Sequence, residues 1–556
     1  MKIAVSELIV KYLERLGVEY IFGMPGAHIL PVYDSLYDSS VKSVLVKHEQ
    51  GAAFMAGGYS RASGKISACI TTAGPGATNL VTGIANAYAE KQPVLIITGE
   101  TSTYIFGKGG LQESSGEGGS IDQIGLFKGI TKYSKMIERT DYLAHALNQA
   151  AKILLSPNSG PVLLSFPYNV QKELVDASIL DSINTDIRLA VARQRSLPVD
   201  ALTHLIIEAQ HPVIIAGYGC IKAGAQNAVA QLSELMAIPV TTSLKGKGVI
   251  GDDAELSLGC LGVTSNGDAY QYIIEHADLL IFLGASFNER TSYLWDAKLM
   301  ADKKVAQIDY DPEQLEKVFK ADVAIQDDIH HALCELLEKL EDSDASKKDL
   351  AQFYLHKNAI KNKVPNNKTN SLESKFALVK QFYAKLETHF PENVMIFDDN
   401  IIFAQNYFRV SKGNRYYPNS GISSLGHAIP AAIGARFSTQ QPTFAILGDG
   451  GFQMCCMEIM TAVNYNIPLN IVVFNNATMS LIRKNQVQLY HNRFIDCDFT
   501  NPDFHFLAMS FGIRHKKISS EADLDDLFAN SDLTSSINLI EIMIDKDAFP
   551  NYISGR

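Results

Sequence analysis

The sequence predicts an α/β protein of three doubly wound domains with parallel sheets. The first observation behind this prediction is the length of 556 residues, which exceeds what one hydrophobic core usually holds. The second is the alternation of strand-like apolar runs with stretches of helical periodicity along the whole chain, a pattern typical of helices that cover a parallel sheet. An apolar fraction of 46% and a charged fraction of 20% are ordinary for a globular protein.

The alternation falls into three blocks, which we interpret as domains. The first block spans residues 1–170 and closes on the strand-like PVLLSFP. The segment from Val170, VQKELVDASILDSINTDIR, is predicted to be a polar linker. The second block spans residues 195–340 and the third spans residues 372–556, with charged and asparagine-rich stretches between them. The first and third blocks have similar length and alternation, which fits a duplicated fold.

Charge and composition exclude several classes of partner. A net charge of −11 gives no basic surface for nucleic acid or an anionic membrane. The N-terminal MKIAVSELIVKYLERLG lacks the apolar core of a signal peptide, and no stretch approaches the ~18 apolar residues of a membrane span. The seven cysteines have neither disulfide nor zinc spacing. We therefore expect a cytoplasmic protein without nucleic acid or membrane partners.

The most informative segment runs from Gly448 to Asn476. It starts with Gly-Asp-Gly after an apolar run, continues with a helical pattern, and ends in Asn-Asn after a second apolar run. Asp449 and Asn476 are thereby placed at the carboxyl ends of neighbouring strands, where open α/β sheets bind ligands. Mg²⁺ prefers such oxygens, and a glycine turn lets the backbone approach a diphosphate. A surface turn followed by an asparagine cap is the structural alternative.

The spacing and both ends of this segment resemble the diphosphate- and magnesium-binding motif of thiamine diphosphate enzymes. The resemblance implies that Asp449 and Asn476 ligate Mg²⁺ by their side chains and that Thr478 does so by its backbone carbonyl. It also implies that the glycines of the motif border the cofactor: Gly448, Gly450 and Gly451.

The first block offers an acid–base partner for the reactive end of a cofactor. Glu49 follows the strand-like VKSVLVK and precedes a helix rich in alanine and glycine. A carboxylate at such a junction, facing an apolar neighbour, is expected to have a raised proton affinity, which suits proton exchange with a weakly basic ring nitrogen. TTAGPGATN, residues 71–79, forms a further glycine turn between strand and helix. A solvated glutamate at a helix start is the alternative.

Both stretches resemble the pyrimidine-binding half of the thiamine diphosphate family, in the branch that contains acetolactate synthase. The resemblance implies that Glu49 hydrogen-bonds the aminopyrimidine nitrogen and that Pro75 and Asn79 line the pyrimidine. In GISSLGHAIPAAIGA, residues 421–435, it places Leu425 beneath the cofactor as the bulky side chain that holds it bent. An ordinary core role for Leu425 fits the sequence equally well.

The resemblance covers nearly the whole chain, in the order pyrimidine-binding, central and diphosphate-binding domain. In that family Glu49 and Asp449 meet across a subunit interface, so a homodimer or homotetramer with shared active sites is implied, and a small regulatory subunit is a further candidate partner. Gly217, Gly219 and Gly224 follow a strand of the central block. Relatives hold FAD there, leave the place empty or bind another nucleotide, so FAD stays an open alternative.

Several residues that would face substrate also match biosynthetic acetolactate synthases: FGMPGA (residues 22–27), Gln112-Glu113, Thr131-Lys132, Arg483 and Gln486. The resemblance implies that pyruvate is decarboxylated and joined to a second 2-oxo acid, with Gln112 orienting substrate. It also implies a place in branched-chain amino acid biosynthesis.

Other residues depart from that family. SSGEGGS, Ser114 to Ser120, is a predicted flexible insertion near the site entrance. Asn485 replaces a tryptophan and Ser286 replaces an arginine that binds the acceptor carboxylate, which weakens the expected preference for a 2-oxo acid acceptor. These departures keep open an acyloin lyase or cyclic-diketone hydrolase, similar to benzaldehyde lyase or cyclohexane-1,2-dione hydrolase. A regulatory relative with a dead site is a third alternative, which the intact Glu49, Asp449 and Asn476 argue against.

His28 has two interpretations. Synthases usually have a small residue at this point, whereas benzaldehyde lyase and cyclohexane-1,2-dione hydrolase carry a histidine nearby. If His28 reaches the cofactor, it can relay protons to the substrate oxygen. A loop histidine with satisfied hydrogen bonds is the alternative.

Overall fold

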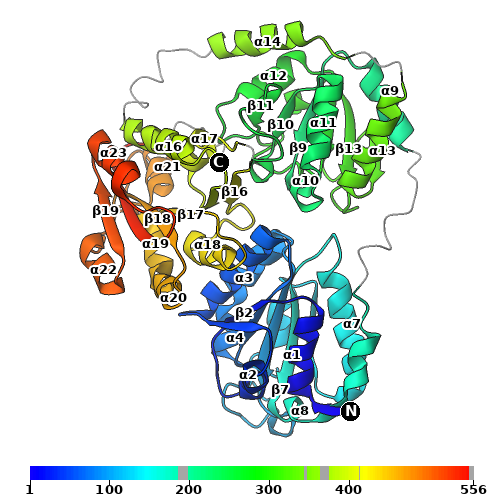
Figure 1. The fold of residues 1–556 in the computed structure, drawn as a ribbon, viewed down its shortest axis with the longest axis vertical. Coiled ribbons are helices and arrows are strands. Elements are labelled where there is room, and N and C mark those ends of the chain that lie inside the picture. Colours follow the sequence, from blue (N-terminus) through cyan, green and yellow to red (C-terminus); the bar gives the residue numbers. More distant parts are fainter. Residues whose placement is uncertain (186–197, 344–346, 364–374, 412, 550–556) are drawn as a thin grey trace.

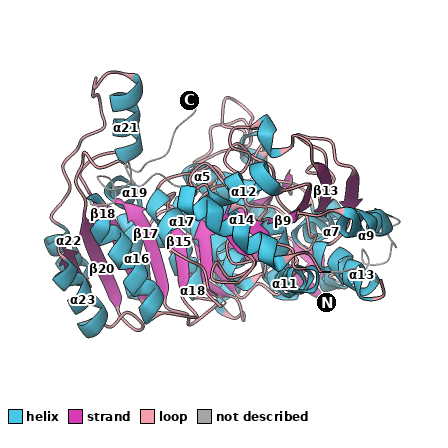
Figure 2. Ribbon diagram, turned by 90° about the horizontal axis from the view of Figure 1, so that it is seen from above, coloured by secondary structure: helices cyan, strands magenta, loops and turns pink. Residues whose placement is uncertain are grey.

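The computed structural model describes residues 1–185, 198–343, 347–363, 375–411 and 413–549 (Figure 1). The described chain forms three six-stranded sheets, and every strand pair within them is parallel. In Figure 2, helices surround the strands of the C-terminal sheet. The prediction of an α/β protein with three parallel-sheet domains is confirmed.

The N-terminal sheet contains β2 (Tyr20–Gly23), β3 (Lys42–Leu45), β4 (Ser67–Thr71), β5 (Val94–Glu100), β6 (Tyr133–Met136) and β7 (Val162–Pro167). Its order is β3-β2-β4-β5-β7-β6. Strands β4, β5 and β7 are buried along their whole length, so they appear in the sequence as continuous apolar runs. The helices of this domain are α1 (Val5–Arg15), α2 (Leu30–Tyr37), α3 (Glu49–Ser63), α4 (Pro75–Asn79), α5 (Val81–Ala89), η1 (Thr103–Ile105), α6 (Gln123–Phe127), η2 (Thr140–Tyr142), α7 (Leu143–Leu154) and α8 (Tyr168–Gln171).

The stretch predicted as a polar linker is partly structured. β8 (Leu174–Asp176) pairs antiparallel with β1 (Lys2–Ala4), and η3 (Ala177–Ser182) follows it. The hydrogen bonds of β8 come from a strand at the other end of the domain, which a local pattern cannot reveal. The last residues of the stretch, from 186, lie outside the described part of the chain.

The central sheet contains β9 (Pro212–Ala216), β10 (Val240–Thr242), β11 (Ser257–Cys260), β12 (Leu279–Leu283), β13 (Lys304–Asp309) and β14 (Val323–Gln326). Its order, β11-β10-β9-β12-β13-β14, reverses direction between β9 and β12, where doubly wound sheets form a ligand crevice. Its helices are α9 (Pro198–Glu208), α10 (Tyr218–Lys222), α11 (Gln226–Met236), η5 (Leu244–Gly246), α12 (Asp268–His276), η6 (Ala297–Leu299), α13 (Ile329–Glu341) and α14 (Leu350–Lys363).

The C-terminal sheet contains β15 (Met395–Asp398), β16 (Arg415–Pro418), β17 (Thr443–Gly448), β18 (Leu469–Asn475), β19 (Arg514–Ile518) and β20 (Ile537–Met543). Its order is β16-β15-β17-β18-β20-β19. Numbered from its own first strand, this sheet repeats the order of the N-terminal sheet, which supports a duplicated fold. Its helices are α16 (Ala377–His389), α17 (Ile402–Tyr407), α18 (Ala428–Arg436), α19 (Asp449–Cys455), η7 (Cys456–Glu458), α20 (Ile459–Asn464), α21 (Ser480–Leu489), α22 (Phe504–Phe511) and α23 (Glu521–Asn530).

Helix α3 of the N-terminal domain packs against α18 of the C-terminal domain, and Figure 1 shows them side by side. The two backbones touch. A Cβ at Gly58 would lie 2.0 Å from the carbonyl oxygen of Ala431, and a Cβ at Gly434 would lie 2.0 Å from that of Met55. One hydrophobic core continues across this contact, so the first turn of α3 has a fixed position relative to the C-terminal domain. No helix in the described ranges has the length and apolar character needed to cross a bilayer.

Candidate cofactor and substrate site

The Gly-Asp-Gly residues lie where β17 meets α19. β17 ends at Gly448 and α19 begins at Asp449, so the structure has no separate glycine turn: Gly448 is the N-cap, and Gly450 and Gly451 belong to the first helical turn. Asp449 is 2% exposed. Burial raises the pKa of this carboxyl, and its hydrogen-bond donors oppose the rise. Those donors are Nδ2 of Asn501 and the backbone N–H groups of Gly450, Asn476 and Ala477.

The oxygen atoms around Asp449 suit a hard divalent cation. Nδ2 of Asn476 donates to Oγ of Ser480 at 2.6 Å, and its Oδ1 accepts from the Thr478 N–H at 3.4 Å. Thr478 is buried, with its hydroxyl donating to the Cys497 carbonyl at 2.8 Å. A carboxylate, an amide oxygen and a backbone carbonyl are ligands that Mg²⁺ accepts, so these residues fit that metal. Among the described side chains, no group of three or more His, Cys, Asp and Glu is suited to a metal ion.

Glu49 is the first residue of α3 and is 8% exposed. Its Oε2 accepts a hydrogen bond from Nδ2 of Asn79 at 2.9 Å. Asn79 is the last residue of α4, and Pro75, which is exposed, is the first. The structure therefore brings together the start of α3 and the end of α4, which places the three residues predicted for the pyrimidine end on adjoining helix termini.

His28 and Gln112 meet above the carboxyl ends of β2 and β4. Oε1 of Gln112 accepts from Oγ1 of Thr72 at 3.1 Å and lies 3.3 Å from Nδ1 of His28. The His28 backbone N–H donates to the same Thr72 hydroxyl at 3.4 Å. Gln112 reaches this place with a left-handed backbone, φ 56°. Three loops far apart in the sequence thus form one polar cluster.

Two carboxylates anchor the insertion Ser114–Ser120. Oε1 of Glu100, the last residue of β5, accepts from the backbone N–H groups of Thr101 at 2.7 Å and Ser114 at 3.0 Å. Glu100 is fully buried, its Oε2 has no hydrogen-bond partner among the residues that the structure describes, and burial raises its pKa to about 7. The second carboxylate, Glu113, accepts from Ser115 Oγ and from the backbone N–H groups of Gly107, Gly109 and Gly110.

Leu425 is half-buried in the loop before α18, and Asp399 ties this loop to the Gly-Asp-Gly helix. Asp399 accepts from the backbone N–H groups of Gly426 at 2.7 Å and His427 at 3.1 Å. A Cβ at Gly451 would lie 2.7 Å from Oδ2 of Asp399, so only a glycine leaves room for this carboxylate. Burial raises the pKa of Asp399 to about 6. Asp399 was not identified from the sequence. The acidic pair that follows an apolar strand could have indicated this residue.

The predicted site residues therefore form two groups. The N-terminal group contains His28, Glu49, Pro75, Asn79 and Gln112, and the C-terminal group contains Leu425, Gly448, Asp449, Gly450, Gly451, Asn476 and Thr478. Within the described part of one chain, none of the hydrogen bonds made by these side chains joins one group to the other.

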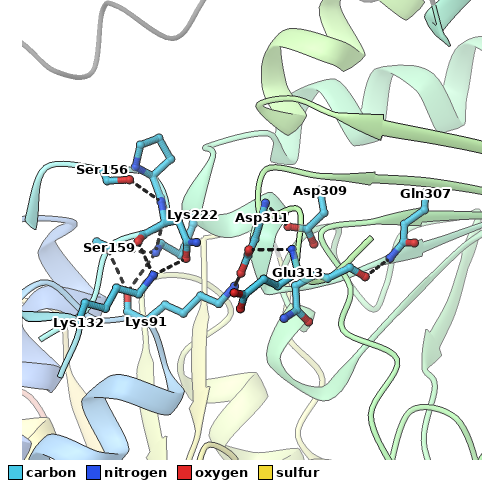
Figure 3. Close-up of polar contacts among 12 residues, drawn as sticks. Lys91, Lys132, Ser156, Ser159, Lys222, Gln307, Asp309, Asp311 and Glu313 are labelled. Atoms are coloured by element: carbon cyan, nitrogen blue, oxygen red, sulfur yellow. Dashed lines mark hydrogen bonds and ion pairs between the residues drawn. The ribbon is translucent and has the colours of Figure 1, made fainter. Parts of the chain in front are cut away.

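The carboxyl edge of the central sheet faces the N-terminal domain (Figure 3). Nζ of Lys91 lies 2.6 Å from Oδ2 of Asp311, just after β13. Lys222 on α10 donates to the Lys91 carbonyl at 3.0 Å. The predicted glycine loop after β9 is packed against the loop after β12, since a Cβ at Gly217 would lie 2.1 Å from the Gly284 carbonyl oxygen. This glycine is explained by loop packing and gives no independent support to a bound dinucleotide.

Comparison with known proteins gives matches over most of the chain. Three family models match: the N-terminal TPP binding domain of thiamine pyrophosphate enzymes at residues 3–122, their central domain at 199–336 and their C-terminal TPP binding domain at 400–541. The chain is 33% identical to a probable acetolactate synthase large subunit of Methanocaldococcus jannaschii, over 97% of this chain and 92% of that protein. It is 31% identical to the acetolactate synthase isozyme 2 large subunit of Escherichia coli, over 95% and 93% of the two chains. The corresponding large subunit of Lactococcus lactis is 31% identical, over 97% and 92%.

Proposed function

Since the chain belongs to the thiamine pyrophosphate enzyme family, in its acetolactate synthase branch, we propose that it decarboxylates pyruvate and joins the remaining two-carbon unit to a second 2-oxo acid. Thiamine diphosphate, when bound, supplies the carbon nucleophile and electron sink that this chemistry needs. The observation that carries the proposal is the placement of two polar half-sites on duplicated sheets. Glu49 with Asn79 lies on one sheet, and Asp449 with Asn476 lies on the other.

Glu49 is proposed to exchange a proton with the aminopyrimidine ring of the cofactor. Its burial and the hydrogen bond from Asn79 restrict the carboxylate to one orientation, as a general acid–base group requires. Asn79 is proposed to hold Glu49 in that orientation, and Pro75 to border the ring. Leu425, held by the neighbouring Asp399 contacts, is proposed to support the cofactor from below.

The diphosphate end is proposed to lie at the first turn of α19. Asp449, Asn476 and Thr478 offer Mg²⁺ one carboxylate and two neutral oxygens, which leaves room for diphosphate oxygens in its coordination shell. The glycines at positions 448, 450 and 451 present backbone at a helix N-terminus, where anions bind favourably.

Gln112 and His28 are proposed to orient the substrate. Because Oε1 of Gln112 is occupied by Thr72 and His28, its amide N–H groups remain to donate to a substrate oxygen. His28 donates from Nδ1 to that acceptor, which leaves Nε2 as the free ring nitrogen. Asn485 and Ser286, where synthases carry tryptophan and arginine, leave the identity of the acceptor to experiment.

A second copy of the chain is proposed to complete each site, in a homodimer or homotetramer. Large apolar side chains that are more than half exposed border both groups of site residues. Met454 lies on the Asp449 helix and Met457 lies in η7 directly after it, and Tyr104 and Leu111 flank the loop that leads to Gln112. Exposed apolar surface of this kind marks an interaction site. Pairing the N-terminal group of one copy with the C-terminal group of the other would bury both surfaces.

Three further predictions stay proposals. The proposal that a small regulatory subunit binds rests on the names of the relatives, which are called large subunits. FAD in the central domain rests on resemblance alone. Cytoplasmic location rests on composition.

The product formed from pyruvate tests the proposal. Purified protein with thiamine diphosphate and Mg²⁺ is incubated with carbon-13-labelled pyruvate, and carbon dioxide and condensed product are measured by mass spectrometry and NMR. Acetolactate formed together with carbon dioxide supports a synthase. Cleavage of acyloins or cyclic diketones without carbon dioxide release from pyruvate would instead establish the lyase or hydrolase alternative. Omission of thiamine diphosphate is the control.

A further inference from the structure

The chain that leads into Glu49 is held by side chains of the C-terminal domain. The segment Leu45–His48 connects β3 to α3, and each of its four backbone N–H groups has an acceptor. The Val46 N–H uses the Gly23 carbonyl of its own sheet. The Leu45 N–H donates to the Tyr465 hydroxyl at 2.8 Å. The N–H groups of Lys47 and His48 donate to one carboxylate oxygen, Oε1 of Glu458, at 3.1 and 2.9 Å.

Glu458 is buried, and its carboxylate accepts hydrogen bonds from backbone N–H groups and a hydroxyl. It ends η7, directly after the α19 helix that carries Asp449, and is 3% exposed. Its Oε2 accepts from the Thr461 hydroxyl at 2.7 Å and from the Lys47 N–H at 3.3 Å. The Lys47 and His48 N–H groups can only donate, and an ionised carboxylate has only acceptor positions. Burial raises the pKa of Glu458, and these hydrogen bonds oppose the rise. The site also lies at the amino end of α3, where a negative charge is favourable.

Gly51, in the first turn of α3, gives a second observation of the same contact. A Cβ at this position would lie 2.2 Å from Oε1 and 2.6 Å from Cδ of Glu458. The carboxylate is therefore packed directly on the helical turn that begins with Glu49, and any side chain at position 51 would displace it.

We infer that Glu458 is a positioning residue for Glu49, acting through the Lys47 and His48 backbone and the first turn of α3. This inference rests on the proposed function, in which Glu49 exchanges a proton with the cofactor. Glu458 reaches neither Glu49 nor Asp449 by a hydrogen bond of its own within the described contacts. Its effect is to fix the backbone from which Glu49 projects, and displacement of an acid–base group by about 1 Å can lower a rate by about 10²-fold.

Glu458→Gln tests the inference, because the amide keeps the size of the side chain but turns N–H groups toward N–H donors. We expect kcat to fall about ten-fold or more, with the KM for pyruvate little changed. The same substitution in a Glu49→Gln background should have little further effect on the residual rate, because the group being positioned is already lost. Thr461→Val is the matched control. It leaves both backbone contacts of Glu458 in place and should change kcat little.

Gly51→Ala tests the contact from the other side and retains the carboxylate, so it serves if Glu458→Gln folds poorly. It should show the same loss of kcat and the same lack of additivity with Glu49→Gln. Amide hydrogen exchange of the peptide that covers residues 44–54, measured by mass spectrometry, should increase in Glu458→Gln and in Gly51→Ala.

Three results would overturn the inference. These are an unchanged kcat, exchange that is unaffected, or a full multiplicative loss in the Glu49→Gln background, which would indicate general destabilisation. Wild-type protein without any thiamine diphosphate-dependent turnover would refute the proposed function and this role together. If the wild type is active and the effects of Glu458→Gln and Glu49→Gln are additive, this role alone is refuted.

Discussion

Nδ1 of His28 lies 3.3 Å from Oε1 of Gln112, an oxygen that already accepts a hydrogen bond from Thr72. An amide oxygen can only accept, so His28 must carry its proton on Nδ1 when it is neutral. The other ring nitrogen is then available to receive a proton, and the amide N–H groups of Gln112 are left as donors for another acceptor. The two side chains that the sequence could only propose separately therefore form one unit with a defined donor and acceptor pattern.

His28→Ala should lower kcat/KM for the 2-oxo acid about 10²-fold if His28 assists proton transfer, the lower end of the range typical of a positioned acid–base group. Affinity for thiamine diphosphate, measured by calorimetry, should stay within about two-fold because the Asp449 group is untouched. Thr72→Val is the control, since it removes the shared hydroxyl but leaves the imidazole. Unchanged kinetics in His28→Ala would establish the alternative, a loop histidine with satisfied hydrogen bonds.

Glu49→Gln should lower kcat by about 10²-fold or more while cofactor affinity falls only slightly. The amide occupies the same volume beside Asn79 but cannot exchange the proton. Single-turnover measurements with saturating cofactor separate the chemical step from binding. Asn79→Ala, which only frees the carboxylate, should cost about ten-fold or less. A Glu49→Gln enzyme with wild-type kcat would exclude Glu49 as the acid–base group.

Asp449→Asn should abolish the stabilisation that thiamine diphosphate and Mg²⁺ together give the folded protein. The substitution removes a charged ligand and places an amide against the N–H donors of Asn476, Ala477 and Asn501. Ligand that binds only the native state raises Tm by mass action, so the Tm increase on adding cofactor and metal measures binding directly. EDTA should remove the same increase from wild-type protein, and Mg²⁺ should restore it.

Asp503→Asn is the control for this experiment. Asp503 accepts from the first N–H groups of α22 in the same domain and has no hydrogen bond to Asp449 within the described contacts, so its variant should keep the Tm increase. An Asp449→Asn protein that still gains Tm from cofactor and metal would place the diphosphate elsewhere.

Much of the fold and the nearest contacts within each half-site could be predicted from the sequence, because both depend on local patterns. Buried parallel strands appear as apolar runs, and the residues just after them meet at one sheet edge, as Asp449 and Asn476 do. The start of α3 at Glu49 was similarly readable from the change of periodicity.

Contacts made across the sequence could not be predicted in this way. The antiparallel pair β1–β8 joins the two ends of one domain, and Glu458 holds a segment more than four hundred residues away. Asp399 fixes the Leu425 loop only because Gly451 leaves space for it. None of these side chains carries a local signature that separates it from an ordinary acidic residue. The central glycine loop resembles a ligand motif, although close packing alone explains Gly217.

The stability of the folded Glu100→Gln variant, relative to that of wild type, should increase as the pH rises. Burial raises the pKa of folded Glu100 to about 7, above the ordinary glutamate value, so the folded state binds this proton more tightly than the unfolded state does. The stability that the protonated form contributes is complete below the unfolded pKa and is lost as the pH rises through the folded pKa. The Tm of the variant minus that of wild type should therefore increase between about pH 6 and about pH 8.

Glu113→Gln is the matched control for Glu100. The Gly107 N–H and further donors lower the pKa of Glu113, so this carboxylate is ionised in both folded and unfolded protein over the same interval. Its Tm difference should be flat there. A flat difference for Glu100→Gln as well would show that Glu100 is ionised in the native protein throughout.

Two inactive variants should restore activity when they are combined. If Glu49 of one copy serves the site that contains Asp449 of the other, a mixed dimer of Glu49→Gln and Asp449→Asn has one site with both residues intact and one with neither. Random reassortment of chains in a dimer then gives about one quarter of wild-type activity, since about half of the dimers are mixed and half of their sites are intact. Co-expression with two different affinity tags, followed by sequential purification, isolates the mixed dimers, which should show about half of wild-type activity. A dimer of a wild-type chain and a double variant, carrying both substitutions on one chain, should be inactive, because each of its two shared sites then contains one substitution. If each site used Glu49 and Asp449 of the same chain, the mixed dimers of single variants would be inactive, and that result would remove the shared-site arrangement while leaving the roles of both residues in place.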